Sequence, residues 1–354
     1  MIRYDPFSLR LSSPLGTAAG RIEERRGFVV RIESDGHRGV GEAAPLPGWT
    51  ESYDDCEAAL SGAAGGSSAA DPTDPLDRID VATPAARHGV ELAWADARAQ
   101  AAGESLAAWL ADGSPAASVP VNATVGDAPV EATAEATREA VEAGYEAVKV
   151  KVGAREQDAD AARLRAVRDA AGDGVELRAD ANGAWDGPTA ERMVDLAAEL
   201  EFAYVEQPRP ASDLAGNAAV RGRGVDIAVD ESVAAVGVDA ILDAEVADVV
   251  ICKPMALGGP VRTRELARRA SAQGVDTVVT TTIDGVVART GALHVAAALP
   301  DVPACGLATG GLLASDLAPD PAPVDAGRMA VPAGPGLAGA FDSLRAGAGV
   351  PDGN

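Results

Sequence analysis

The chain has 354 residues, with 54 Asp and Glu against 30 Lys and Arg, and a formal net charge of −24. A surface this acidic repels nucleic acid and anionic membranes, so neither is expected as a partner. Only Lys149, Lys151 and Lys253 are lysines. Because Arg keeps its proton near neutral pH whereas the pKa of Lys shifts readily on desolvation, we expect these three positions to need proton transfer or a compact ammonium group.

The composition also bears on where the protein works. The first ten residues contain no apolar signal-peptide core, and no run of about 18 apolar residues occurs. Cys56, Cys252 and Cys305 are odd in number and form no CxxC pair, which predicts neither a zinc site nor a disulfide framework. We expect a cytoplasmic protein, and the dispersed acid with scarce lysine indicates a salt-rich, halophilic cytoplasm.

The length favours about two domains. Strand-like alternation over 3–11, 27–33 and 39–43, followed by helical stretches at 53–60 and 84–102, predicts an α+β domain over residues 1–118. The Gly- and Ser-rich stretch at 61–68 is expected to be a flexible connection between the two helices.

From about residue 119 the pattern changes to short apolar runs that alternate with amphipathic helical stretches. Such runs occupy 147–152, 175–179, 202–205, 226–229, 246–252 and 276–280, with 119–124 opening and 303–308 closing the series. This alternation predicts a parallel β/α barrel of the (β/α)7β type over 119–317, with an open doubly wound sheet as the alternative. Residues 318–354 are rich in Pro and Gly and are expected to pack back on the body.

Charged residues stand at the ends of these runs, where the active site of a β/α barrel lies. Lys149 and Lys151 are two apart and therefore share one face of their strand. Asp180, Glu206 and Asp230 end the next three runs, and Lys253 ends the one after.

Three carboxylates that converge on one volume need a cation, and an all-oxygen ligand set suits Mg²⁺. The alternative is that each acid caps the helix that follows its strand. A lysine close to another lysine and a metal ion loses its proton more easily, so it could act as a general base toward a carboxylate substrate.

The ordered set Lys149-x-Lys151, Asp180-Ala-Asn182, Glu206-Gln-Pro, Asp230-Glu-Ser and Lys253-Pro resembles the muconate-lactonizing subgroup of the enolase superfamily. The resemblance covers essentially the whole chain. It implies that the α+β segment is a capping domain. It also implies that Asp180, Glu206 and Asp230 bind Mg²⁺, with Mn²⁺ as a possible substitute, and that Lys151 and Lys253 face the substrate from opposite sides. Lys149 would support Lys151, and Asn182 would stand behind the metal ligands.

The segment Gly41–Ser52, with Pro14-Leu15 to Arg26-Gly27 before it, resembles the o-succinylbenzoate synthases of menaquinone biosynthesis. That resemblance implies a dehydratase (hydro-lyase) acting on 2-succinyl-6-hydroxy-2,4-cyclohexadiene-1-carboxylate, with Thr280, Thr282 and the backbone near Gly306 lining the pocket. A β-branched strand end is the alternative explanation of the threonines.

Other activities remain open. N-succinylamino-acid racemases and other cycloisomerases or epimerases of the subgroup would use the same catalytic residues. Residues 305–310 contain no acid, which disfavours a dipeptide epimerase, and His294 is expected to be a helix residue and not a catalyst. A non-catalytic barrel and a Schiff-base aldolase are further alternatives. A homo-oligomer is possible.

Overall fold

The computed structural model describes residues 1–17, 20–34, 36–65 and 75–347. Its N-terminal part is an antiparallel sheet of β1 (Ile2–Thr17), β2 (Gly20–Ser34) and β3 (His37–Ala43), in that order. The strands are longer than the predicted ones because the β1–β2 pairing continues to Thr17 and Gly20. Buried Phe28, Val29 and Val30 of β2 belong to the core beneath this sheet.

Helices α1 (Tyr53–Gly65) and α2 (Pro84–Ala102) follow, with η1 (Pro75–Arg78) between them and α3 (Leu106–Leu110) after them. Helix α2 approaches β3 so closely that a Cβ atom at Gly39 or Gly41 would lie 1.8 or 2.1 Å from a helix carbonyl oxygen. The predicted end of the first helix near residue 60 is wrong, since α1 continues to Gly65. The remaining part of the predicted flexible connection, 66–68, lies outside the described residues.

The predicted parallel barrel is confirmed. A curled parallel sheet has the order β11-β10-β9-β8-β7-β6-β5. Its strands are β5 (Ala123–Val125), β6 (Ala147–Lys151), β7 (Glu176–Asp180), β8 (Tyr204–Glu206), β9 (Asp226–Val229), β10 (Val249–Cys252) and β11 (Asp276–Val279). Buried Val148, Val150, Leu177 and Val205 pack against the surrounding helices.

Residues 305 and 306 link the end of β11 to residues 120 and 121, just before β5. The Cys305 amide donates to Pro120 O at 2.8 Å, and the Gly306 amide donates to Val279 O at 2.9 Å. The predicted opening run at 119–124 is divided, because β4 (Ser118–Pro120) pairs antiparallel with β13 (Arg328–Ala330) and only β5 joins the parallel sheet.

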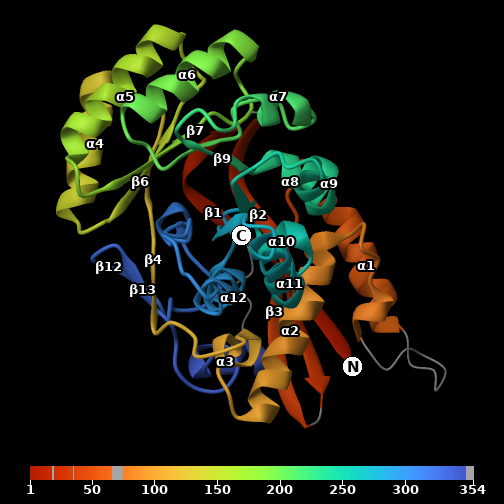
Figure 1. Cartoon of the computed structure of the whole chain (residues 1–354). Helices are drawn as coiled ribbons and strands as arrows, with labels where there is room; N and C mark the ends of the chain where they lie inside the picture. The colour runs from red at the N-terminus through yellow and green to blue at the C-terminus, as the bar shows by residue number, and fades with distance from the viewer. Residues whose placement is uncertain (18–19, 35, 66–74, 348–354) are drawn as a thin grey trace.

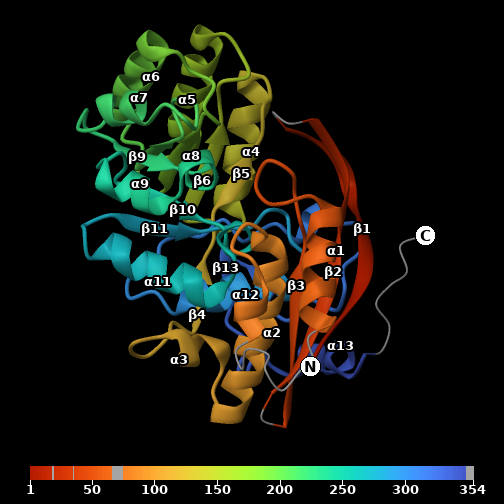
Figure 2. The ribbon, with the colours of Figure 1, turned by 90° about the vertical axis from the view of Figure 1, so that its right-hand side faces the viewer.

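Figures 1 and 2 show the barrel helices outside the strands and α2 lying between the N-terminal sheet and the barrel. These helices are α4 (Val130–Glu142), α5 (Gln157–Ala171), α6 (Gly187–Glu199), α7 (Leu214–Ala219), α8 (Glu231–Val236), α9 (Val238–Asp243), α10 (Pro254–Leu257), α11 (Pro260–Ser271) and α12 (Val286–Ala297). No helix within the described part of the chain is long and apolar enough to cross a membrane.

The C-terminal segment contains η2 (Gly310–Leu312), β12 (Val324–Asp325), β13, η3 (Gly339–Phe341) and α13 (Asp342–Ala346). Arg345 of α13 contacts buried Asp96 of α2 at 2.9 Å, and the Leu337 amide also donates to Asp96. The domain boundaries at 118 and 317 stay a prediction.

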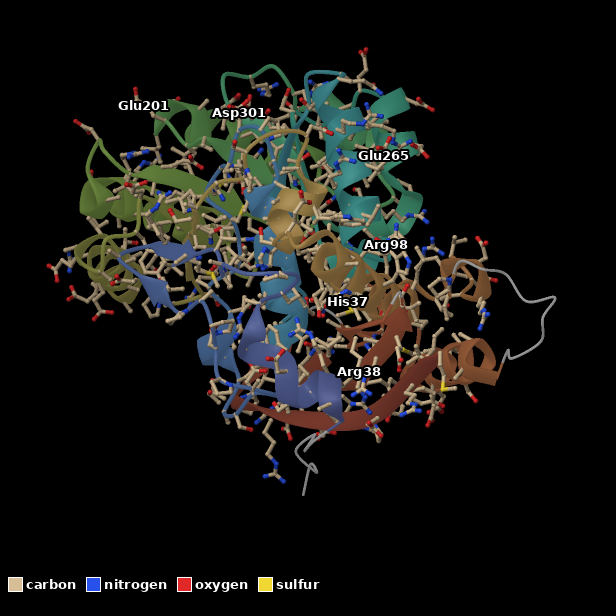
Figure 3. The ribbon with its side chains drawn as sticks, turned by 90° about the horizontal axis from the view of Figure 1, so that it is seen from below. His37, Arg38, Arg98, Glu201, Glu265 and Asp301 are labelled. Carbon is tan, nitrogen blue, oxygen red and sulfur yellow. The ribbon has the colours of Figure 1, made fainter. Side chains whose placement is uncertain are left out.

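Figure 3 shows exposed Glu201, Glu265 and Asp301 spread over separate parts of the barrel side.

Candidate active site

The charged residues expected at the strand ends are brought together at the carboxyl edge of the barrel. Lys149 and Lys151 lie on β6, Asp180 ends β7 and Glu206 ends β8. Asp230 directly follows β9 and Lys253 directly follows β10. In the sheet register Lys151 pairs with Asp180, and Asp180 pairs with Glu206. The parallel register therefore places these side chains at one level.

Asp180 and Glu206 are linked through the ammonium groups of β6. Lys149 Nζ lies 3.1 Å from Asp180 Oδ2 and 3.1 Å from Glu206 Oε1. Lys151 Nζ lies 2.5 Å from the same Oδ2 atom of Asp180. Two lysines thus share one carboxylate oxygen.

On the other side of the cluster Lys253 Nζ lies 2.6 Å from Asp230 Oδ2. It also lies 3.2 Å from the ring centroid of Trp49, in the loop after β3. A cation over an aromatic face is attracted by the electron density of the ring. Lys253 is therefore held between a carboxylate and an indole.

The three lysines differ in exposure. The side chain of Lys151 is 35% exposed, against 15% for Lys149 and 10% for Lys253. Of the three, Lys151 is thus the one most accessible from outside.

Burial and charge shift the pKa values of this cluster in opposite directions. Burial and the nearby charge of Asp180 raise the pKa of Glu206 to about 8. Burial also opposes ionisation of Asp180, but Lys149 and Lys151 outweigh it and hold the pKa of that carboxyl below its usual range. For Lys149, Glu206 and Asp180 outweigh burial and raise the pKa well above the usual value. The cluster is thus a set of buried acids that depends on cations for its ionisation.

The donor set fits Mg²⁺. Asp230 Oδ1 and Glu231 Oε2 are buried oxygens without a hydrogen-bond partner, and the other candidate ligands are carboxylates as well. Within the described ranges, no three His, Cys, Asp or Glu side chains are arranged to hold an ion as they stand. The contacts above explain this, since lysine ammonium groups engage all three acids. Ion binding would replace some of these lysine contacts.

Comparison with known proteins identifies the family. The family described as "Enolase C-terminal domain-like" matches residues 132–344, more than half of the chain. The chain belongs to the enolase superfamily. Residues 4–97 match the family described as "MenC, N-terminal domain", so the resemblance found for the capping segment is confirmed.

Individual relatives divide between several reactions. The chain is 44% identical to an o-succinylbenzoate synthase of Thermobifida fusca over 208 residues, 57% of this chain and 63% of that enzyme. It is 27% identical to a chloromuconate cycloisomerase of Cupriavidus necator over 82% of both chains. Among solved structures, a dipeptide epimerase of Methylococcus capsulatus complexed with Mg and a dipeptide is 28% identical, with a TM-score of 0.81 and 95% and 98% of the two chains covered.

Asn182, which was predicted to stand behind the metal ligands, links several members of this cluster. Its φ is +46°, its amide donates to Asp180 Oδ1 at 3.1 Å, and its Oδ1 accepts from Lys151 Nζ at 3.0 Å. Its Nδ2 donates to Glu231 Oε1 at 2.7 Å. Asn tolerates the left-handed region better than most residues, which suits it to this turn.

Trp49, Glu231 and Gln207 stand within the sequence motifs above, but no role was predicted for them. The Oε1 atom of Gln207 accepts from the amides of Asp230 and Ser232, at 3.0 and 3.1 Å, and so fixes the start of α8. Gln207 and Glu231 each follow a predicted strand-end acid directly, and this adjacency was the available signal. Trp49 lies in a Pro- and Gly-rich loop, and no local pattern indicated that it reaches Lys253.

The predicted substrate-binding residues form the β11 side of the barrel mouth. Thr280 Oγ1 donates to Gly306 O at 2.9 Å, and Thr282 Oγ1 donates to Asp284. A Cβ atom at Gly306 would lie 2.4 Å from Thr280 Oγ1, so glycine permits this approach. Their hydroxyl protons serve the loop itself, and their role toward a substrate stays a prediction.

His294 lies inside α12, where its Nδ1 accepts from the Ala107 amide at 3.2 Å. Burial lowers its pKa to about 4. A cavity of about 10 Å³ lies beside Lys253 and Trp49, whereas a hollow of about 420 Å³ lies outside the barrel between α5 and α6. We place the site at the lysines because the larger hollow contains none of the strand-end residues.

Proposed function

We propose that this protein is a Mg²⁺-dependent dehydratase that converts 2-succinyl-6-hydroxy-2,4-cyclohexadiene-1-carboxylate to o-succinylbenzoate. The observation that carries the proposal is the asymmetry of the two outer lysines. Each of these lysines is bonded to a carboxylate, but the side chain of Lys151 is 35% exposed, whereas that of Lys253 is 10% exposed and lies against the Trp49 ring. The similarity of residues 4–97 to the MenC N-terminal domain supports the choice of substrate.

Loss of water from this substrate needs one base that later serves as an acid. Neutral Lys151 takes the proton from the ring carbon that carries the carboxylate. The C–H electron pair becomes a new double bond between this carbon and the neighbouring carbon, whose bond to the hydroxyl group breaks. Lys151 returns its proton to that leaving group, so water departs and the ring becomes aromatic. A base of this kind contributes typically 10²–10⁴-fold to the rate.

The remaining residues of the site would bind the metal ion and orient the substrate. Asp180, Glu206 and Asp230 would hold Mg²⁺, which when bound would neutralise the substrate carboxylate and make the adjacent proton more acidic. Mn²⁺ offers the same preference for oxygen ligands and could replace it. Lys253 stays protonated on the opposite side, bonded to Asp230. Lys149 keeps Asp180 and Glu206 in place through its two contacts.

Racemisation of an N-succinylamino acid is the second candidate. It is favoured by the presence of a lysine on each side of the carboxylate cluster, Lys151 from β6 and Lys253 after β10. Racemisation in both directions requires each lysine to act in turn as the base that removes the proton from the alpha carbon. The ring of Trp49 lies 3.2 Å from Lys253 Nζ and leaves its side chain only 10% exposed, which disfavours its access to a substrate as a base. Dipeptide epimerisation has less support, since residues 305–310 offer no carboxylate for an amino group.

The experiment is to compare kcat/KM for the two reactions on one preparation of Mg²⁺-loaded protein. Dehydration is followed by ultraviolet absorbance and racemisation by optical rotation. We expect dehydration to exceed racemisation at least a hundredfold. Racemisation that is equal or faster would replace the dehydratase by the second candidate.

A further inference from the structure

One buried arginine, Arg25 of β2, joins two loops at the barrel mouth. Its Nη2 donates to Ala44 O at 2.7 Å and its Nη1 donates to Pro45 O at 3.1 Å, both in the loop that leads to Trp49. Its Nε donates to Ile283 O at 3.2 Å, in the loop after β11. Arg25 is only 2% exposed. A single guanidinium therefore ties a capping loop to a barrel loop.

The backbone at Ile283 is strained. Its φ is +62°, a region that β-branched residues rarely adopt. This conformation is unfavourable for an L-residue with a Cβ, and such residues persist only where their surroundings hold them. The hydrogen bond from Arg25 to the carbonyl of Ile283 is one of the contacts that hold it.

The next residues of the same loop are held from the capping side as well. Glu42 of β3 is fully buried and accepts from the amides of Gly285 and Ala288, at 2.7 and 2.9 Å. These amides belong to the first turn of α12, whose N–H groups otherwise lack partners. Arg25 and Glu42 thus fix the loop between β11 and α12 from two neighbouring strands.

An arginine that merely neutralised an acid in a domain interface would direct its guanidinium at a carboxylate. All three hydrogen bonds of Arg25 go instead to backbone carbonyls of the two loops. The planar fork of Arg can bind carbonyls in several fixed directions at once, which Lys cannot. The three hydrogen bonds of Arg25 therefore fix the positions of the two loops relative to each other.

We propose that Arg25 is a positioning residue that sets the separation of loops 44–50 and 280–285 and thereby the affinity for substrate. These loops carry Trp49 on one side and Thr280 and Thr282 on the other. The effect of Arg25 on substrate affinity rests on the proposed function, whereas its effect on the two loops does not. Arg25 does not contact the three lysines, so it acts through the loops.

The test is Arg25→Lys, which keeps the charge and loses the fork. We expect KM for the cyclohexadiene carboxylate to rise at least tenfold while kcat changes less than threefold. A purely structural defect would reduce the active fraction, lowering kcat at unchanged KM. We also expect amide hydrogen exchange of the substrate-free protein to become at least tenfold faster in both 44–50 and 280–285.

Arg345→Lys is the matched control, because Arg345 is also buried but contacts Asp96 and Ala338 O, away from both loops. It should leave KM and exchange in 44–50 and 280–285 unchanged. Unchanged exchange in either segment of Arg25→Lys, or an unchanged KM, would overturn the proposal. If the wild type does not turn over the diene, the proposed function fails while the exchange experiment still tests Arg25.

A second variant keeps the proposal testable if Arg25→Lys does not fold. Glycine adopts positive φ freely but gives the backbone more freedom, so Ile283→Gly loosens the loop and leaves Arg25 in place. Exchange should accelerate in 280–285 and not in 44–50, and KM should rise. An Ile283→Gly enzyme with wild-type KM would contradict the link between loop position and affinity.

Discussion

Lys151 Nζ lies 2.5 Å from Oδ2 of Asp180, a carboxylate without exposed side-chain surface that Lys149 also contacts. The most accessible of the three lysines therefore rests on a proposed metal ligand. In the proposed site, an ion that bound this oxygen would displace the ammonium group of Lys151 and stand beside it as a second positive charge. Metal binding and the proposed base would thus be coupled through one atom.

Lys151→Arg should abolish turnover, lowering kcat at least a thousandfold, because Arg cannot give up its proton. Stability should change little, since the side chain is partly exposed and Arg retains the charge. Steady-state kinetics and a thermal melt check both expectations. An Arg variant that keeps a tenth of the activity would remove Lys151 from the role of base.

Trp49→Ala should lower kcat/KM by about threefold to thirtyfold, because a cation–π contact contributes about 0.5–2 kcal/mol. The ring lies 3.2 Å from Lys253 Nζ. Trp49→Phe retains an aromatic face and should recover most of the loss. Steady-state kinetics of the two variants test this. An equal loss of kcat/KM in the Phe and Ala variants would mean that the size of the ring matters and its π face does not.

Asp230→Asn should weaken Mg²⁺ binding at least tenfold, since an amide replaces a charged ligand. Titration calorimetry on the folded protein measures this without reference to activity. Asp243→Asn, at an exposed position of α9, serves as the control and should bind Mg²⁺ as the wild type does. Equal affinities of the two variants would exclude Asp230 as a ligand.

Glu42 should make stability depend on pH. Burial and the charge of Asp284 raise its pKa to about 8 from an ordinary 4.5. Between these values the folded state binds a proton that the unfolded state has lost, so the free energy of unfolding falls as pH rises, by at most about 1.4 kcal/mol per pH unit.

Glu42→Gln removes this titration and keeps an acceptor oxygen. Chemical denaturation of both proteins is measured at pH 5 and pH 8 with Mg²⁺ present. Between these two pH values, the free energy of unfolding should fall less for Glu42→Gln than for the wild type. Parallel pH dependence of wild type and variant would show that Glu42 is ionised throughout.

The net charge of −24 should make stability depend on salt. Self-repulsion of a highly charged surface destabilises the compact state, and the Debye length falls from about 10 Å at 0.1 M to about 3 Å at 1 M. We expect the Tm to rise between 0.1 M and 2 M KCl, and by a similar amount in NaCl. A Tm that falls over this range would contradict the proposed adaptation to salt.

The barrel and the positions of its charged residues could be predicted from the sequence because both follow from local patterns. Parallel strands end at a common edge, so acids after successive apolar runs, such as Asp180 and Glu206, necessarily approach one another. The order of the strands follows from the right-handed β/α connections that such repeats require.

Other features depend on contacts between distant segments. Trp49 reaches Lys253 only because the capping loop folds over the barrel, and Arg25 meets Ile283 across 258 positions of sequence. The continuation of α1 to Gly65 was missed because its Gly- and Ser-containing end has weak helix propensity. In this segment the buried Ala63 packs on the core and outweighs that propensity.

The most direct measurement is the ultraviolet absorbance of 2-succinyl-6-hydroxy-2,4-cyclohexadiene-1-carboxylate incubated with the protein in molar KCl and Mg²⁺. We expect rapid loss of the diene band, which stops when EDTA is added and resumes with excess Mg²⁺. A folded, metal-loaded protein that leaves the diene band unchanged would contradict the proposed dehydratase activity.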